Sequence, residues 1–145
     1  MSTVTDVAGH IRQIWSGSAF MQLLKINIDE IHCGGATVSM PIDLDIHTNH
    51  WLGVHGGALA AVADAVMGVT GASVGEVVQT LNLNINFISN LPGTGTVFVS
   101  SQIKHHGQTT MVIAAEMTDE QGNLLATIST TMFIAGHFNE IPKAW

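Results

Sequence analysis

The feature that most constrains the fold is an apolar stretch from about residue 51 to residue 75, in which Asp64 is the only acidic residue. The stretch is long enough to span a bilayer. However, it is rich in Gly and Ala, also contains His55, and has no Lys or Arg beside it. A central Asp costs roughly 2.5–3.5 kcal/mol on insertion scales, which Ala and Gly offset poorly. We therefore predict a helix over residues 56–72 of a globular domain, apolar nearly all round and buried on every side.

The segments around this helix alternate between apolar and polar residues, as β-strands do. Upstream, an apolar spacing from Val4 to Trp15 predicts a short helix that begins near Thr5 or Asp6 and ends at Gly17. A hairpin follows, with strands over residues 24–29 and 36–42 and a turn at Gly34-Gly35, and residues 43–51 form a polar loop. Downstream, four further strands are predicted, over residues 80–87, 97–103, 111–117 and 124–134.

The order of elements is helix, two strands, long helix and four strands. Short turns make the sheet antiparallel, and a sheet curled around the apolar helix is the simplest way to bury it, which gives an α+β fold. The length of 145 residues and the absence of repeats or low-complexity linkers predict one domain over residues 1–145, with a core over about 21–136.

Composition narrows the function. The formal net charge is −7 and only four residues are basic, which excludes nucleic acid as a partner. Hydrophobic residues make up 46% and charged residues 10%, so we expect excess apolar surface to be covered by another subunit. Cys33 is the only cysteine, and no basic start precedes an apolar block near the N-terminus. No intrachain disulfide or signal peptide is therefore expected, and we predict a cytoplasmic protein.

Two features of the predicted helix point to chemistry. Gly56 and Gly57 lie at its start, where unpaired N–H groups and the helix dipole favour negative charge, as in an oxyanion hole. Alternatively, the glycines only permit a tight entry to the helix. Asp64 has no Lys or Arg within one turn, and its small neighbours leave room for a substrate. A buried carboxylate of this kind is usually paired, raised in pKa or functional, and a hydrogen-bonded structural Asp is the alternative.

The spacing of these features predicts a dimer. Eight residues separate Gly56 from Asp64, or about 12 Å along a straight helix. An attacking group and an oxyanion donor must each lie about 3 Å from the reacting centre. A second, antiparallel copy of the helix could place Asp64 of one chain opposite Gly56 of the other, giving an obligate two-fold dimer with two composite sites. An element of the same chain that supplied the missing partner would remove this inference.

The pattern Asn49-x-x-x-Gly53-x-His55-Gly56-Gly57, with Asp64 nine residues after the His, resembles the hotdog thioesterases of the PaaI-like (phenylacetic-acid pathway) group. The Asn84-Ile85-Asn86-Phe87 strand is also similar to that family, and the similarity extends over about residues 21–136. The resemblance implies a hotdog fold, a double-hotdog dimer often paired into a homotetramer, acyl-CoA substrates, and no cofactor or metal.

By motif position, the resemblance implies that Asp64 is the nucleophile or general base. The Gly56 N–H, with His55 beside it, polarises the thioester carbonyl, and Asn49 orients the thioester or the attacking water. Thr80 matches a hydroxyl residue that the family places after the helix. The expected substrate-binding residues are Gly57, Trp51, Leu52, Lys104, His105 and His106; Trp51 and Leu52 are candidates for the acyl pocket and the last three for the coenzyme A phosphates.

The histidines at positions 47, 50 and 55 raise the question of a metal site. There is no His-x-x-x-His pair and no Cys cluster, so we expect no metal. The predicted function is hydrolysis of an aromatic or medium-chain acyl-CoA. Two alternatives stay open: a non-catalytic acyl-CoA sensor or binding module, and a hotdog enoyl-CoA hydratase or dehydratase acting on the same ligands.

Overall fold

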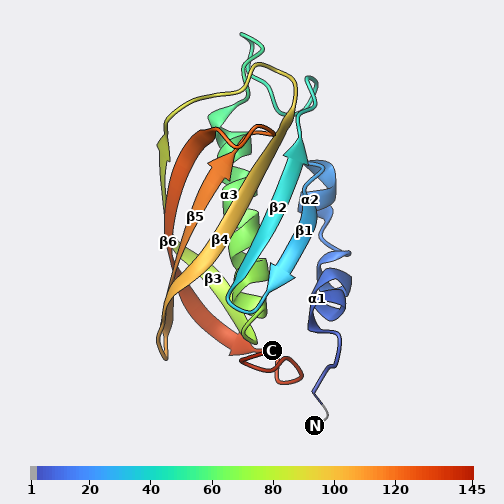
Figure 1. The fold of residues 1–145 in the computed structure, drawn as a ribbon, viewed down its shortest axis with the longest axis vertical. Helices are drawn as coiled ribbons and strands as arrows, with labels where there is room; N and C mark the ends of the chain where they lie inside the picture. Colours follow the sequence, from blue (N-terminus) through green and yellow to red (C-terminus); the bar gives the residue numbers. More distant parts are fainter. Residues whose placement is uncertain (1–2) are drawn as a thin grey trace.

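The computed structural model describes residues 3–145 and contains one antiparallel sheet around a long helix, as predicted (Figure 1). The sheet order is β1-β2-β4-β5-β6-β3, and helix α3 lies against one face of the sheet. In chain order the elements are α1 (Val7–Trp15), α2 (Ala19–Leu23), β1 (Asn27–His32), β2 (Gly35–Pro41), α3 (Gly56–Ala72), β3 (Glu76–Phe87), β4 (Thr96–His106), β5 (Thr110–Thr118) and β6 (Leu124–His137).

The core lies between α3 and the inner face of the sheet. In β4 and β5 alternate residues point inward and are buried, as the period of two requires, whereas most of strand β2 is buried. These side chains pack on the helix and include Val38, Met40, Val97, Val99, Met111, Ile113 and Met117. The predicted hotdog fold, a curved antiparallel sheet wrapped around a central helix, is confirmed.

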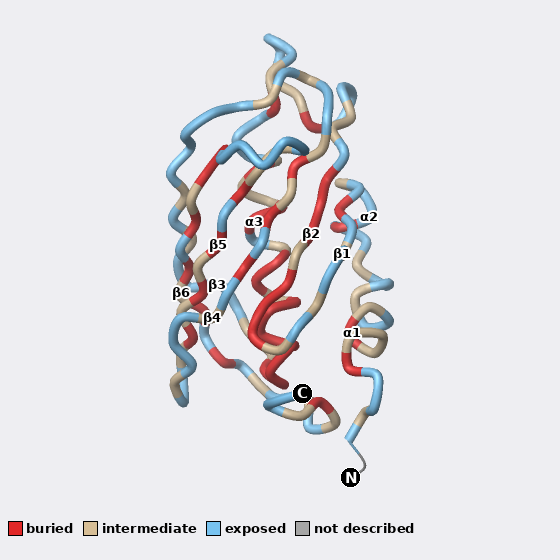
Figure 2. The backbone as a smooth tube through the Cα atoms, viewed as in Figure 1, coloured by how far each residue is buried: buried red, intermediate tan, exposed pale blue. Residues whose placement is uncertain are grey.

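The expectation that α3 is buried on every side is wrong for its first half. From Val66 to Ala72 every residue is buried except Gly68, whereas Gly56, Gly57 and Asp64 are exposed (Figure 2). Periodicity reports only that a face is apolar, and this face is built from glycines and alanines whose small side chains leave it open within one chain.

The N-terminal region contains one helix that the pattern did not predict. Helix α1 begins after Asp6, whose carboxylate accepts from the Gly9 N–H at 2.9 Å. The unpredicted α2 has five residues, too few for helical periodicity to be recognised, and is capped by Ser18. The first strand begins at Asn27 instead of at Leu24 because Lys25 has a positive φ of 59°, which interrupts the extended backbone.

Strand β3 forms an open edge of the sheet, because within the described chain it pairs only with β6. Its register with β6 shifts between Thr80 and Asn82, so Leu81 is an extra, bulged residue. As a result the apolar positions of β3 do not all face inward: Leu81 is 62% exposed and Phe87 is 53% exposed. The adjoining Ile88 is 59% exposed, so apolar side chains line this edge.

Within residues 3–145, none of the helices combines the length and apolar character that crossing a bilayer requires.

Candidate active site

The start of α3 presents one unpaired backbone donor. His55 caps the helix: its Nδ1 accepts from the Gly57 N–H at 2.9 Å, and its carbonyl accepts from Ala58 and Leu59. Among the described residues, the Gly56 N–H has no acceptor. Gly56 is exposed, and a Cβ built on it would meet only Phe87 Cζ, at 3.8 Å, among the side chains of the described residues, so little covers this start of the helix. This is the geometry that an oxyanion or a polarised carbonyl oxygen requires.

A pocket of about 300 Å³ adjoins this donor. Its walls come from the first turns of α3 and from the segment that follows β3, and they combine apolar and polar side chains: Gly56, Leu59, Phe87, Ile88, Ser89 and Asn90. Asn90 also holds the entry to the helix, because its Nδ2 donates to the Val54 carbonyl at 2.9 Å. The pocket therefore offers a mixed polar and apolar surface next to the Gly56 N–H.

The loop before α3 is held by its own polar side chains. Asn49 Oδ1 accepts from the backbone N–H groups of Trp51 (3.0 Å) and Gly53 (3.1 Å), so its carboxamide oxygen shapes the turn that leads to His55. At the beginning of the loop, Lys25 donates to Asp43 at 2.6 Å. That bond, helped by the Asp45 N–H, lowers the pKa of Asp43. Charge-assisted bonds of this kind fix the loop from which His55 and Gly56 emerge.

Asp64 lies two turns further along α3 and is exposed in the single chain, contrary to the expectation of a buried carboxylate. Its Oδ1 accepts from the Thr80 hydroxyl at 2.6 Å. The rest of its surroundings within the chain form a pocket of about 210 Å³, with walls from α1, α2, α3, β3 and β6. The structure thus brings together Asp64 and Thr80, two residues that sequence reasoning assigned to catalysis.

A single chain does not bring Asp64 and Gly56 together. Their eight-residue separation on one helix amounts to about 12 Å. The pocket at Gly56 and the pocket at Asp64 have no residue in common. The two groups therefore occupy separate surfaces of the protomer.

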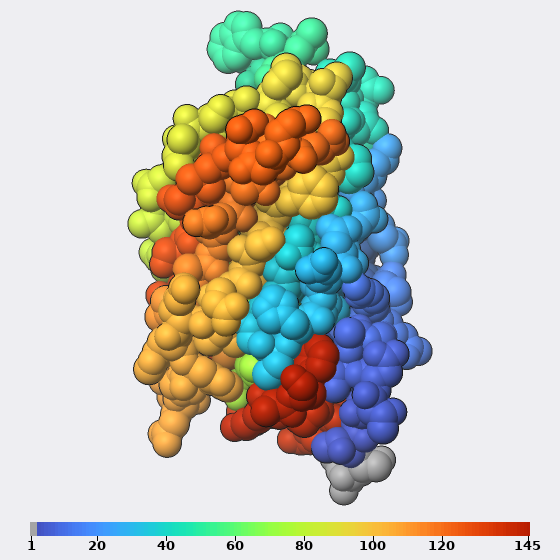
Figure 3. Space-filling model, viewed as in Figure 1, coloured from blue at the N-terminus to red at the C-terminus, as the bar shows by residue number. Residues whose placement is uncertain are grey.

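The other predicted residues lie apart from both pockets. Trp51 is 79% exposed and Leu52 64% exposed, on a loop that projects from one end of the molecule (Figures 1 and 3). Neither residue lines the pocket at Gly56 or the one at Asp64. Lys104, His105 and His106 lie at the end of β4, at the opposite end of the molecule.

At that opposite end, His106 belongs to a polar cluster. Its Nε2 is 2.8 Å from Oε1 of the buried Glu76, and His137 is hydrogen-bonded to the other carboxylate oxygen. Among residues 3–145, no group of three or more His, Cys, Asp or Glu side chains is arranged to hold a metal ion. The structure gives His106 a partner within the protein, and a contact with coenzyme A phosphates stays a prediction.

Sequence reasoning missed most of the lining of both pockets. Phe87, Ile88, Ser89 and Asn90 adjoin Gly56 only because β3 runs antiparallel to β6 and ends beside the start of α3. Trp15, Phe20 and Met21 adjoin Asp64 because α1 and α2 fold back onto the helix. The sequence signal for this part of the lining is the pair of aromatic residues, Trp15 and Phe20, in an N-terminal segment that carries no other motif.

Comparison with known proteins identifies the family and the fold of the chain. The family model described as the thioesterase superfamily matches residues 53–126, just over half of the chain. The chain therefore belongs to the thioesterase superfamily. It is an enzyme of the thioester hydrolase class, as the motif predicted.

Three individual proteins illustrate the similarity. Acyl-coenzyme A thioesterase THEM4 of Rattus norvegicus is 32% identical over 81 residues, which is 56% of this chain and 35% of THEM4. The E. coli PaaI protein from the phenylacetic acid degradation operon superposes with a TM-score of 0.85 at 22% identity, covering 94% of this chain and 98% of PaaI. A thioesterase-named protein of Streptococcus pneumoniae TIGR4, solved with coenzyme A, gives a TM-score of 0.78 at 22% identity, covering 86% and 97%. The two structural similarities establish the fold.

Proposed function

We propose that this protein hydrolyses acyl-CoA thioesters at sites shared between the two subunits of a homodimer. The thioester carbonyl oxygen accepts from the Gly56 N–H of one subunit, and the Asp64 carboxylate of the other subunit acts on the carbonyl carbon. The observation that carries the proposal is the unpaired Gly56 N–H at the start of a 17-residue helix whose exposed carboxylate lies two turns away.

The open edge of the sheet supports a two-fold dimer. Strand β3 has 12 residues and one unpaired side, and exposed edges of this length are normally covered. Leu81, Phe87 and Ile88 expose large apolar side chains along it, and the adjacent face of α3 is built from small residues. Antiparallel apposition of two such faces covers the apolar surface and places each Asp64 opposite the other chain's Gly56. Pairing of these dimers into a homotetramer, and a cytoplasmic location, remain predictions from the sequence.

The reaction follows from where charge develops. When the carbonyl carbon is attacked, its oxygen becomes an oxyanion, which the Gly56 N–H and the dipole of α3 stabilise. The carbon–sulfur bond then breaks and coenzyme A leaves as its thiolate, which takes a proton from Asp64 when that carboxylate has deprotonated water, and from solvent otherwise. Asp64 either attacks the carbon itself, forming an acyl anhydride that water hydrolyses, or removes a proton from the attacking water. In both cases the Thr80 hydroxyl holds the Asp64 carboxylate in one orientation.

The pocket at Gly56 suits coenzyme A as the thiol side of this substrate. The pantetheine amides of coenzyme A match the mixed polar and apolar pocket formed by Gly56, Phe87, Ile88, Ser89 and Asn90. Its phosphates would be held by backbone groups together with a few cations, because the chain has only four Lys and Arg residues.

Release of free thiol from a panel of acyl-CoA esters tests the activity. Binding without thiol release would favour an acyl-CoA sensor, and hydration of enoyl-CoA would favour a hydratase.

A proline substitution isolates the oxyanion donor. Gly56 is the first residue of α3, a position where proline is well tolerated, and His55 before it already has the extended backbone that a following proline requires (φ −66°, ψ 131°). Gly56→Pro thus removes the N–H while keeping the helix. We expect kcat to fall by about 10²–10³-fold, the effect of deleting one oxyanion-hole donor. Gly56→Ala, which keeps the N–H, is the matched control and should lose far less activity.

Hybrid dimers test whether the sites are shared. In a co-refolded mixture of Gly56→Pro and Asp64→Asn chains, each hybrid dimer would have one site with both an intact Gly56 N–H and an intact Asp64. Random mixing should then restore about a quarter of the wild-type activity. If each site lay within one chain, the mixture would be as inactive as its parents, and the shared-site mechanism would be abandoned.

A further inference from the structure

We propose that the pocket beside Asp64 receives the acyl group of the substrate, and that residues 15–21 of the same chain determine which acyl groups fit. This inference rests on the proposed thioesterase function and adds the determinant of its substrate range. Trp51 and Leu52 do not line the Asp64 pocket of their own chain. Their role in the acyl pocket stays a prediction, which the proposed dimer would fulfil only from the partner subunit.

The pocket begins at the polar Asp64–Thr80 pair and continues along apolar side chains. Asp64 and Thr80 form part of its wall, and it extends along α3 past Ala65 to Gly68. Trp15, Phe20 and Met21, from the end of α1 and from α2, close it on another side. Ser18, Val78 and Met132 complete the lining.

The indole of Trp15 is held in place on two sides. A Cβ built on Gly68 would lie 3.3 Å from Trp15 Cζ2, so the indole packs directly against the helix at the residue one turn after Asp64. On another side the indole packs against Phe138, with ring centroids 6.3 Å apart and an interplanar angle of 53°. A side chain fixed by packing in this way sets the depth of a pocket. Met21 and Met132, which have flexible side chains, allow the remaining wall to adapt.

The two sides of a thioester differ, and so do the two pockets. The coenzyme A side is long and must reach solvent, which matches the larger pocket, of about 300 Å³, at Gly56. The acyl side is shorter, which matches the smaller pocket, of about 210 Å³, whose wall α1 and α2 complete beyond Asp64. With the reacting carbon between Gly56 and Asp64, we place the acyl group in the Asp64 pocket.

The volume of the pocket indicates the size of the acyl group. A protein cavity of about 150 Å³ accommodates a benzene ring. The pocket at Asp64, of about 210 Å³, therefore has room for one aromatic ring with a short linker or for an aliphatic chain of similar bulk. A short acyl group such as acetyl would leave most of its apolar wall in contact with water.

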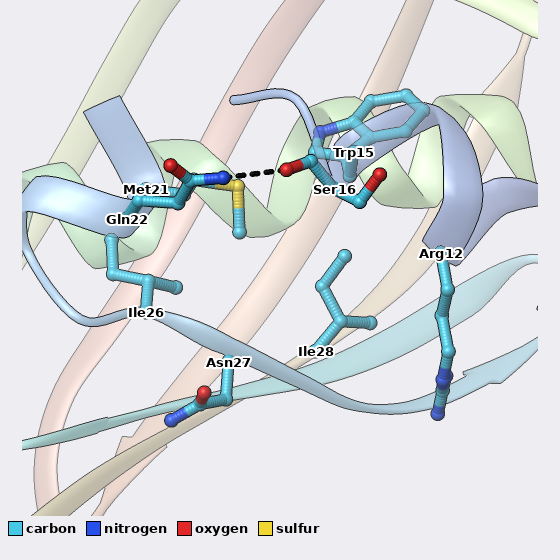
Figure 4. Close-up of a pocket in the computed structure, with 8 residues that line it drawn as sticks. All are labelled: Arg12, Trp15, Ser16, Met21, Gln22, Ile26, Asn27 and Ile28. Carbon is cyan, nitrogen blue, oxygen red and sulfur yellow. Dashed lines mark hydrogen bonds between the residues drawn. The ribbon is translucent and has the colours of Figure 1, made fainter. Parts of the chain in front are cut away.

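A second pocket, on the other side of residues 15–21, makes the proposal testable. It has a volume of about 230 Å³, lies between these residues and β1, and shares Trp15 and Met21 with the Asp64 pocket (Figure 4). It contains Arg12 but neither Asp64 nor Thr80, so it carries no reaction. Trp15 and Met21 are thus a partition, and shortening the indole should join the two spaces.

The first experiment measures acyl-chain preference. We expect the wild-type protein to have a higher kcat/KM for hexanoyl-CoA than for acetyl-CoA or dodecanoyl-CoA. Trp15→Leu should raise the ratio of kcat/KM for dodecanoyl-CoA to that for hexanoyl-CoA by about tenfold or more, the scale at which apolar pockets discriminate chain length. Ile14→Ala, which changes an α1 residue outside both pockets, is the matched control and should leave the ratio unchanged. An unchanged ratio in Trp15→Leu would overturn the proposal.

The second experiment leaves Trp15 intact and needs no turnover. In a chain with Trp51→Phe and Trp145→Phe, Trp15 is the only indole, because the protein has three tryptophans. The non-hydrolysable thioether S-hexyl-coenzyme A should change the Trp15 fluorescence, whereas free coenzyme A should not. Equal responses to both ligands would show that the hexyl group does not reach Trp15. A wild-type protein that hydrolyses no thioester but still gives the S-hexyl response would refute the proposed function and support the acyl pocket.

Discussion

The two halves of α3 have similar sequences and different surroundings. Residues 56–65 and 66–72 are both composed almost entirely of glycines, alanines and aliphatic side chains. The second half is enclosed by the sheet, and its one hydroxyl, that of Thr70, is satisfied by the Val66 carbonyl (2.7 Å) and by Ser101 (2.6 Å). The first half turns the Gly56 N–H and the Asp64 carboxylate outward. One end of the helix thus belongs to the core, and the other end exposes polar groups to solvent.

This difference shows how one apolar helix can serve both stability and chemistry. The buried half contributes large side chains such as Val66 and Met67, which contact the sheet directly. The open half carries small residues on its exposed side, which allow a substrate or a second helix to approach the backbone closely, while Leu59 and Val62 on its other side belong to the core. If this division is correct, substitutions on the exposed side of the first half should change turnover, and substitutions in the second half should change stability.

The largest expected effect is on turnover, from Asp64→Asn. The substitution keeps the shape of the side chain and removes its charge, so kcat should fall by about 10²–10⁴-fold if the carboxylate is the base or nucleophile. The free energy of unfolding should change by about 1 kcal/mol or less, because Asn keeps a side-chain oxygen that can accept from the Thr80 hydroxyl. Thiol-release kinetics and urea unfolding measure the two quantities.

An Asp64→Asn variant that loses stability and keeps its turnover would contradict the difference between the two halves of α3. A variant with near-normal turnover and a large loss of stability would make Asp64 a structural residue, and the first half of α3 would then be a core element like the second. Single-turnover reactions of the wild-type protein in ¹⁸O-labelled water refine the role. Label in the Asp64 carboxylate after one turnover indicates direct attack, whereas label only in the released acid fits activation of water or an anhydride opened at its acyl carbon.

The next effect is on stability, from Met67→Ala in the buried half. Met67 has no exposed surface, so removing its side chain leaves a cavity in the core. We expect the free energy of unfolding to fall by about 2–5 kcal/mol. The value of kcat per folded molecule should stay within about twofold of wild type at a temperature where the variant is folded, because no group at Asp64 or Gly56 moves. A fall in kcat without loss of stability would mean that the two halves are not separable.

A pair of glycine substitutions gives a smaller and more selective effect. A Cβ on Gly71, in the buried half, would lie 2.7 Å from a methyl carbon of Val78 and 3.3 Å from the Glu76 carbonyl oxygen. Gly71→Ala should therefore lower the free energy of unfolding by about 1–3 kcal/mol. At Gly56 the same change meets only Phe87 at 3.8 Å, so we expect a change below about 1 kcal/mol. Thermal unfolding of the two variants measures the difference between their stabilities. Equal losses of stability in Gly71→Ala and Gly56→Ala would contradict the prediction.

Sequence alone predicted the fold well and the site in part. Alternation placed the six strands, and the Gly56–Asp64 spacing identified the two groups that the single chain keeps apart. It could not show that Asp64 is exposed in one chain, because an apolar helix face looks the same whether a sheet or another subunit covers it. It also missed Trp15, Phe20 and Met21, which reach Asp64 only through the fold of a segment that contains a five-residue helix.

The smallest expected effect tests how Asp64 is positioned. Thr80 donates to Asp64 at 2.6 Å from β3, so the open half of α3 is supported by the same edge strand that exposes Leu81. Thr80→Val keeps the shape of the side chain and removes the hydroxyl, and kcat should fall by up to about tenfold, the scale of one hydrogen bond to a charged group at an accessible site.

Thr80→Ser restores the hydroxyl and should recover most of that rate, which a purely steric role for Thr80 would not predict. A loss beyond about a hundredfold in Thr80→Val would exceed what positioning through one hydrogen bond explains. Thr80 would then have to contact the reacting atoms itself. An unchanged rate would instead mean that the Asp64 carboxylate is oriented by the second subunit, and the contrast between the two halves of α3 would then depend on the dimer alone.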